Sequence, residues 1–279
     1  MELRADSAGH WRNPAGRLYL WFDYALAINP NARDRFETRH VFRKFLEGHI
    51  ERRDDDEISI SSPKFYDAVA ELLRLPDEMH LQVVTMSNAP IPKDTLLEAL
   101  PRVRECLDLF GAKPSKPLSE FTRYDQATTK SLNIASHILN NSAPYQPPIP
   151  ETQLEGVRDA AEGLVAMIAQ DSQLDDELRR VLYHHAKAVL DAVDLYQVSG
   201  IEAVLAEFDK LIGVLQRRPD LRRKVKESAV AEKVAGLLMA LNIVAGLGNA
   251  AVAVEAGASS VVELLELSPL DSGDVATPP

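Results

Sequence analysis

The residues best suited to chemistry in this sequence are two adjacent histidines, His184 and His185, and the carboxylates that follow them. On a helix, His184, Asp191 and Asp194 share one face, an arrangement that could form a metal or acid–base site. Adjacent histidines point in different directions, so only one of them can join the carboxylates. Lys187 stands four residues before Asp191 and offers it an ion pair. We therefore expect a charged helix face here, and keep an unrecognised enzyme site near His184 as an alternative.

For two further candidate sites the sequence also favours a structural role over a chemical one. Glu37 and His40 are one helical turn apart, but helical di-metal sites need such a Glu/His pair twice, and only one copy is present. Cys106 is the only cysteine, so no internal disulfide can form, and it has no histidine at useful spacing. We expect a buried structural thiol.

The remaining motifs give no support for catalysis. Gly246-x-Gly248-x-x-Ala251 fits a loose dinucleotide fingerprint, but too little chain follows it to complete such a domain. No metal-ligand, phosphate-loop or nucleophile motif is present in the sequence. We therefore expect no catalytic residue, no metal and no cofactor, and favour a protein that is not an enzyme.

Positive charge is concentrated in one short stretch, RRPDLRRKVK. This basic cluster could contact anionic lipid or an acidic partner, and its members are Arg217, Arg218, Arg222, Arg223, Lys224 and Lys226. No aromatic residue is interleaved to stack on bases, and the whole chain has a net charge of −11. Both features disfavour a nucleic-acid partner.

Residues 234–254 contain no charged side chain. A helix of about 20 residues spans the hydrocarbon layer of a bilayer, and basic residues precede this segment while acidic residues follow it. A helix in the centre of a soluble bundle is equally apolar. Asn242 and Asn249 are seven residues apart and share one face, where each needs a polar partner that a soluble bundle supplies more readily than lipid. We favour the soluble core and keep membrane insertion as the alternative.

The N-terminal half predicts a small α/β or mixed unit over residues 18–142. Its first segment, Leu18–Ala27, is apolar enough for a buried strand or the start of a helix. Alternating residues indicate short strands at 57–61 and 81–87. Ser62 as N-cap and Pro63 at the first helical position begin a helix that we expect to end at Leu75. Other helices are expected over 33–51, 92–110 and 125–141.

The C-terminal half is predicted to be helical throughout. Residues 143–150 hold four prolines and read as an extended linker. Beyond it, an antiparallel helical bundle over 151–267 is expected, with helices at 155–170, 174–198, 201–217 and from Pro219 to about Gly257. Residues 1–17 read as a flexible N-terminus and 268–279 as a disordered tail.

The sequence thus predicts a mainly α, cytoplasmic protein whose function is protein–protein interaction or self-assembly. The apolar fraction of 46% and the charged fraction of 26% are those of a globular chain. The partner is a protein or a second copy of the chain. The alternative is a membrane-engaging effector that uses residues 234–254, at a peripheral or inner-membrane location.

Overall fold

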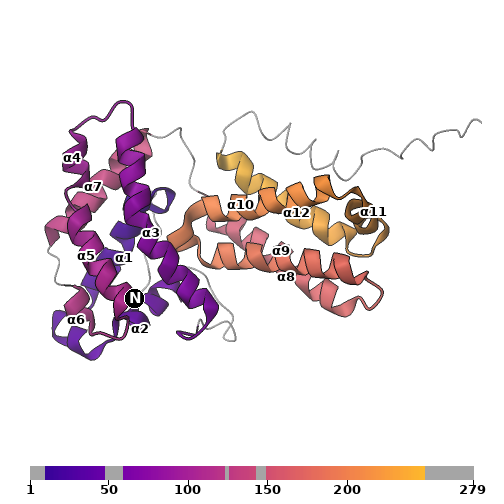
Figure 1. The fold of residues 1–279 in the computed structure, drawn as a ribbon, viewed down its shortest axis with the longest axis horizontal. Helices are drawn as coiled ribbons and strands as arrows, with labels where there is room; N and C mark the ends of the chain where they lie inside the picture. Colours follow the sequence, from indigo (N-terminus) through magenta and orange to yellow (C-terminus); the bar gives the residue numbers. More distant parts are fainter. Residues whose placement is uncertain (1–9, 48–58, 123–125, 143–148, 249–279) are drawn as a thin grey trace, which may run out of the picture. The chain divides into compact units, whose positions relative to one another are not determined.

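The computed structural model describes residues 10–47, 59–122, 126–142 and 149–248, and their regular elements are helices (Figure 1). No β-strand occurs in these ranges; one isolated antiparallel bridge joins Glu37 and Pro117. The helices are η1 (His10–Arg12), α1 (Pro14–Ala27), η2 (Pro30–Arg35), α2 (Thr38–Glu47), α3 (Pro63–Thr85), α4 (Lys93–Leu97), α5 (Leu100–Ala112), α6 (Leu118–Phe121), α7 (Gln126–Ser142), α8 (Glu151–Gln170), α9 (Asp176–Asp194), α10 (Tyr196–Arg217), α11 (Pro219–Glu227) and α12 (Ala231–Gly248).

The chain divides into two compact units. The first contains Met1–Pro148 together with Val189–Ala206, and the second contains Ile149–Ala188 with Glu207–Pro279. The boundary after Pro148 lies within the predicted linker 143–150. The sequence did not predict that residues 189–206 would belong to the first unit.

An aromatic cluster forms the centre of the first unit. The indole of Trp21 packs against Phe42, with ring centroids 5.0 Å apart, and against Phe121 at 5.5 Å. Phe42 in turn meets Phe110 edge-on at 5.4 Å. These four side chains come from α1, α2, α5 and α6 and are almost completely buried. Leu195 and Val198 belong to the same core, which explains why residues 189–206 group with this unit.

Leu18–Ala27, for which strand and helix were both open, is helical. Asn13 caps α1 because its side-chain oxygen accepts the backbone N–H of Gly16 at 2.8 Å, and Pro14 occupies the first turn. A short apolar run is compatible with either a helix or a strand. The Asn13 cap and the proline after it favour the helix.

The predicted α/β character of the N-terminal unit is not found in the described residues. The strand expected at 81–87 was wrong, because α3 continues through Pro76 to Thr85. Its buried side chains recur at helical spacing, and this stripe extends the helix past the proline: Leu72, Leu75, Pro76, Met79 and Val83. Of the strand expected at 57–61, residues 57 and 58 lie outside the described residues, and Ile60 and Ser61 form a turn.

Two predicted helices are each divided into two shorter helices in the described residues. The helix expected over 33–51 is divided into η2 and α2, because the backbone between them pairs with residues 116–118. Residues 48–51 lie outside the described residues. Leu118 N donates to Phe36 O at 2.8 Å, and Thr38 N donates to Lys116 O at 2.9 Å. The helix expected over 92–110 is divided into α4 and α5, which begins with Leu100 and Pro101.

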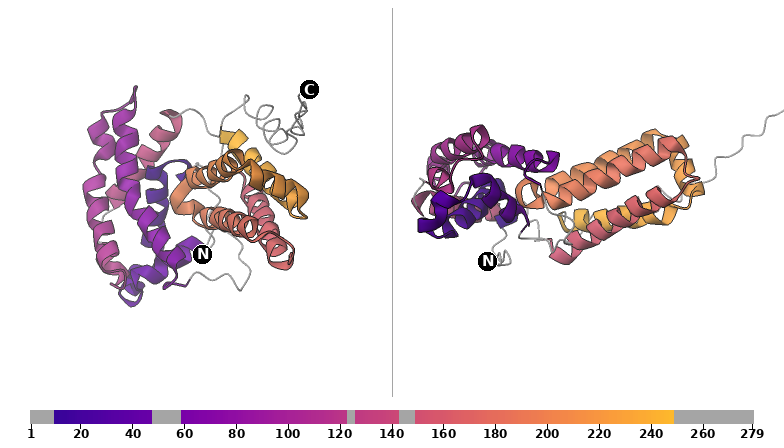
Figure 2. Two further views of the ribbon diagram at one scale, coloured as in Figure 1. Left: turned by 45° about the vertical axis from the view of Figure 1, so that its right-hand side comes forward. Right: turned by 90° about the horizontal axis from the view of Figure 1, so that it is seen from below.

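The second unit is built from long helices that lie side by side in the views of Figures 1 and 2. Asp175 caps α9 by accepting the backbone N–H of Leu178 at 3.1 Å. Arg179 joins α9 to the preceding helix, donating to the carbonyl oxygens of Ile168 at 2.8 Å and Asp171 at 2.6 Å. The most extensive contact in this unit is between α8 and α12.

The long helix expected from Pro219 to about Gly257 is two helices in the described residues. After α11 the backbone of Ser228 is extended, with ψ of 158°, and α12 begins at Ala231. The Ser228 hydroxyl donates to Val225 O at 2.7 Å, and Val230 is buried. These contacts hold the corner between the helices. Residues 249–257 lie outside the described residues.

Gly200 interrupts α10 with a backbone conformation that suits only glycine. Its φ of 70° and ψ of −173° lie in a region that side-chain-bearing residues avoid. A Cβ atom added there would lie 2.5 Å from Arg17 Nη1 and 2.5 Å from Glu202 Oε2. The chain can therefore turn here only with glycine in place.

The predicted effect of Gly200→Ala is a loss of stability. The forced backbone costs about 1–3 kcal/mol, and the clash with Arg17 adds to it. Gly156→Ala is the control: Gly156 lies exposed in α8 with nothing within 4 Å of an added Cβ, so alanine should stabilise by roughly 0.8–1 kcal/mol. Urea unfolding followed by circular dichroism measures both. Equal effects of the two substitutions would contradict the conformation described for Gly200.

Candidate functional site

The basic cluster divides into internally paired and unpaired residues. Arg218 Nη2 lies 3.0 Å from Glu177 Oε1 and 2.8 Å from Asp220 Oδ2, and Lys224 Nζ lies 3.0 Å from Asp175 Oδ2. The hydrogen bond from Arg218 lowers the pKa of Asp220 to about 2. The hydrogen bond from Lys224 likewise lowers the pKa of Asp175. These ion pairs connect α11 to the start of α9.

The other arginines of the cluster face outward. Arg217 and Arg223 are exposed and Arg222 is half-buried, and none of the three has an acidic partner among the residues that the structure describes. Lys226 is exposed and has a partner of its own. The predicted contact with lipid or an acidic partner therefore stays a prediction, with Arg217, Arg222 and Arg223 as its available charges.

The apolar segment 234–254 is described as far as Gly248, within α12, and α12 has two distinct faces. One face is completely buried and packs in the second unit: Val234, Leu237, Leu238, Leu241 and Val244. On the opposite face Met239 is 58% exposed and Ile243 is 51% exposed. Beside them on the same face, Gly236 is exposed and Ala240 is half-buried. We call these four residues, Gly236, Met239, Ala240 and Ile243, the α12 stripe.

The predicted asparagine pair is described only in part. Asn242 is half-buried at the flank of α12, and Asn249 lies outside the described residues, so the pair stays a prediction. Among the helices that the structure describes, none has the length and hydropathy needed to cross a bilayer.

The histidine and carboxylate candidates have other partners. Asp194 is buried and ion-paired with Lys64 of α3, whose ammonium also lies 3.7 Å from Asp191 Oδ1. Glu37 Oε2 lies 2.5 Å from Arg39 Nε and 3.8 Å from His40 Nδ1. Within residues 10–47, 59–122, 126–142 and 149–248, no three metal-ligating side chains form a group that could hold a metal ion.

The thiol of Cys106 is buried, as predicted. Burial raises its pKa to about 11, an effect that the neighbouring Arg102 only partly opposes. The thiol is therefore protonated at neutral pH and is a poor nucleophile.

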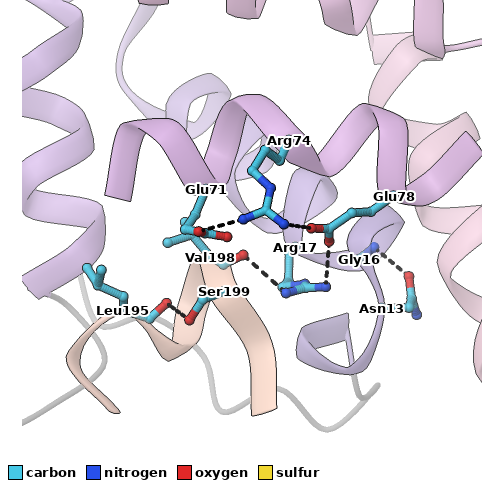
Figure 3. Close-up of polar contacts among 9 residues, drawn as sticks. All are labelled: Asn13, Gly16, Arg17, Glu71, Arg74, Glu78, Leu195, Val198 and Ser199. Atoms are coloured by element: carbon cyan, nitrogen blue, oxygen red, sulfur yellow. Dashed lines mark hydrogen bonds and ion pairs between the residues drawn. The ribbon is translucent and has the colours of Figure 1, made fainter. Parts of the chain in front are cut away.

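The most buried charge among the described residues is that of Arg17, which no sequence pattern had indicated. Its side chain is 3% exposed; Nη1 donates to Val198 O at 3.1 Å, and Nη2 lies 3.5 Å from Glu78 Oε2 (Figure 3). Burial lowers the pKa of Arg17, which Glu202 and Glu78 oppose. The partners are 61 and 181 residues away in sequence, so no local pattern could have revealed them.

A second buried polar group joins α1 to α7. His10 Nδ1 lies 2.9 Å from the Ser136 hydroxyl, and Asn13 Nδ2 donates to Ser136 O at 3.1 Å and Asn140 Oδ1 at 2.8 Å. A Cβ on Gly16 would lie 2.1 Å from His10 O, so glycine is required for this close approach. Ser136 is completely buried. A substrate could not reach the serine, and the group therefore acts as a structural tether.

His185 is the buried titratable group of the second unit. It is 8% exposed, and its Nδ1 has no hydrogen-bond partner among the described residues. Burial lowers its pKa, with further lowering by His184 and Lys210 and an opposing effect of Glu207. The neutral imidazole is therefore the form that the folded chain prefers.

Comparison of the chain with protein-family models, with curated proteins and with solved structures found no match. Its function must therefore be argued from the residues and contacts described above.

Stability should depend on pH through His185. Since the folded-state pKa is depressed, stability is complete above the ordinary histidine pKa of about 6.5 and is lost as pH falls below it, where the unfolded chain takes up the proton more readily. His185→Leu should reduce the loss seen in urea unfolding between about pH 7.5 and pH 5.5. His184→Gln, at an exposed position on the same helix, should retain most of it. An unchanged pH dependence in His185→Leu would show that other groups cause it.

Proposed function

We propose that this chain is a self-associating scaffold protein without catalytic activity, and that two copies meet through the α12 stripe. In this proposal the second unit is an antiparallel helical bundle that holds α12 in place and presents its outer face. The single observation that carries the proposal is the exposure of Met239 and Ile243 on a helix that is uncharged from Val234 to Gly248. A continuous apolar face of this kind is typical of contact surfaces, whereas single exposed apolar residues are not.

The shape of the stripe supports pairing with a second copy. Met239 and Ile243 are four residues apart and form a ridge along the helix. Gly236 and Ala240, also four apart, form a shallow row beside it, and nothing lies within 4 Å of a Cβ added to Gly236. Helices pack by inserting such ridges into such grooves. Because ridge and groove lie on the same face, the stripe is complementary to itself, as a two-fold interface requires.

Charge also favours a second copy at this position. The chain has a net charge of −11, so two copies repel each other over most of their surface. The α12 stripe contains no charged residue, so contact between two stripes brings no like charges together. At its N-terminal end Glu232 and Lys233 are adjacent and exposed. In a parallel two-fold pair, Lys233 of each copy can meet Glu232 of the other, so this ion pair forms twice.

Glutamates in the stripe should prevent association. Met239→Glu with Ile243→Glu would bury unpaired carboxylates at the contact, each costing several kcal/mol, so dimerisation should weaken by at least about a hundredfold. Size-exclusion chromatography with light scattering, over roughly a hundredfold range of concentration, measures the mass. Wild-type protein should have twice the mass of one chain.

The matched control is Leu81→Glu with Val84→Glu, which adds the same charge to exposed apolar positions of α3 and should leave the dimer intact. A wild-type monomer at all concentrations would contradict the proposal. If a chain ending at Gly248 dimerises while the full chain does not, residues 249–279 cover the stripe instead. If wild-type protein is monomeric and binds anionic vesicles through Met239 and Ile243, the membrane-engaging alternative is favoured.

A further inference from the structure

A groove in the first unit runs along the seam between α1 and α7. It has a volume of about 330 Å³ and is lined by side chains of both helices. Small-molecule sites begin at about this size. The lining residues that matter for its chemistry are Tyr19, Asp23 and Leu26 from α1, and Thr129, Lys130 and Asn133 from α7.

Two of these residues have an oxygen without a hydrogen-bond partner. Thr129 Oγ1 and Asn133 Oδ1 are both buried and unpaired among the described residues, and Thr129 is 6% exposed. Two other threonines of this unit bond to the backbone carbonyl four residues earlier: the Thr122 hydroxyl donates to Leu118 O at 2.9 Å, and the Thr85 hydroxyl donates to Leu81 O at 2.7 Å. Thr129 lacks this bond, and an unpaired buried oxygen costs about 1–3 kcal/mol.

The two oxygens belong to one face of α7. Thr129 and Asn133 are four residues apart and therefore lie one above the other along the groove. Both oxygens are shielded from water, so their side chains must rotate toward the groove to meet a ligand. The hydrogen bonds that they gain favour this rotation.

The charged residues that line the groove determine which charged groups a ligand must have. Asp23 contributes a carboxylate from α1 and Lys130 an ammonium from α7, and both are exposed. An ammonium group has three donors. After the rotation, Thr129 Oγ1 and Asn133 Oδ1 can accept two of these hydrogen bonds, and the carboxylate of Asp23 can accept the third. Lys130 can meet an anionic group, and Leu26 and the ring of Tyr19 offer apolar surface.

We propose that this groove binds a small zwitterion of the free amino-acid type. Its ammonium group donates to Thr129 Oγ1, Asn133 Oδ1 and the carboxylate of Asp23, and its carboxylate lies against Lys130. This site is in the first unit and is independent of the α12 stripe.

A panel of L-amino acids tests the proposal on the full-length protein, by thermal shift and by isothermal titration calorimetry. At least one should bind with a Kd of about 1 mM or lower. For the best binder, the matched amine without the carboxylate and the matched acid without the amine should each bind at least about tenfold more weakly, because each lacks one charged contact.

Thr129→Val combined with Asn133→Leu should abolish the binding. Replacing unpaired polar groups by apolar groups of similar size is close to neutral for folding, so the melting temperature without ligand should change little. Thr128→Val is the control, since Thr128 is a buried neighbour on α7 that does not line the groove, and it should bind as wild type.

Several results would overturn the proposal. These are no binding by any amino acid at about 10 mM, equal binding of the amine alone, or unchanged affinity in the double variant. A crystal structure grown with the best binder that shows only water at Thr129 and Asn133 would do the same.

Discussion

The first unit depends on the burial of one positive charge. The Arg17 side chain is almost completely buried, and the free energy of desolvating its guanidinium must be offset by Val198 O, Glu78 and Glu202. The carbonyl of Val198 reaches Arg17 only because the chain turns at Gly200, where an added Cβ would displace the guanidinium. Removing one partner of such a buried group typically costs about 3–5 kcal/mol. The corner between α9 and α10 is therefore part of the same packed unit as the N-terminal helices.

The sequence predicted those parts of the fold that local signals determine. Spacing, capping and composition predicted the helical character, the cap at Ser62, the helices after the proline-rich segment and the buried Cys106. These features are present in the structure. The segment 81–87 was predicted to be a strand from its residue pattern, yet the burial of Met79 and Val83 at helical spacing shows that tertiary packing continues α3 to Thr85. Arg17 and Ser136 could not be predicted as buried polar centres, because their partners come from distant helices. The groove between α1 and α7 was missed for the same reason.

The two proposed sites differ in the physical property of the helices on which each depends. The α12 stripe is a surface with no hydrogen-bonding demand, so it suits a partner that is itself apolar. The groove of the first unit has hydrogen-bonding oxygens that its own helices leave unpaired, so it suits a small polar molecule. The basic cluster differs from both, because Arg218 and Lys224 are engaged with acidic residues of α9 and position α11. Arg217, Arg222 and Arg223 have no acidic partner among the described residues, and the predicted contact with lipid or an acidic partner depends on them.

The first unit is built from two segments that are separated in the sequence, and this has a consequence for its synthesis on the ribosome. Residues 1–148 leave the exit tunnel before Leu195 and Val198, so their core is incomplete and the carbonyl that receives Arg17 is still missing. Translation of the 58 residues from 149 to 206 takes roughly 3–12 s at about 5–20 residues per second. During this interval the nascent N-terminal helices expose apolar surface. Chaperones that recognise such surface would have their longest access to this polypeptide at that stage.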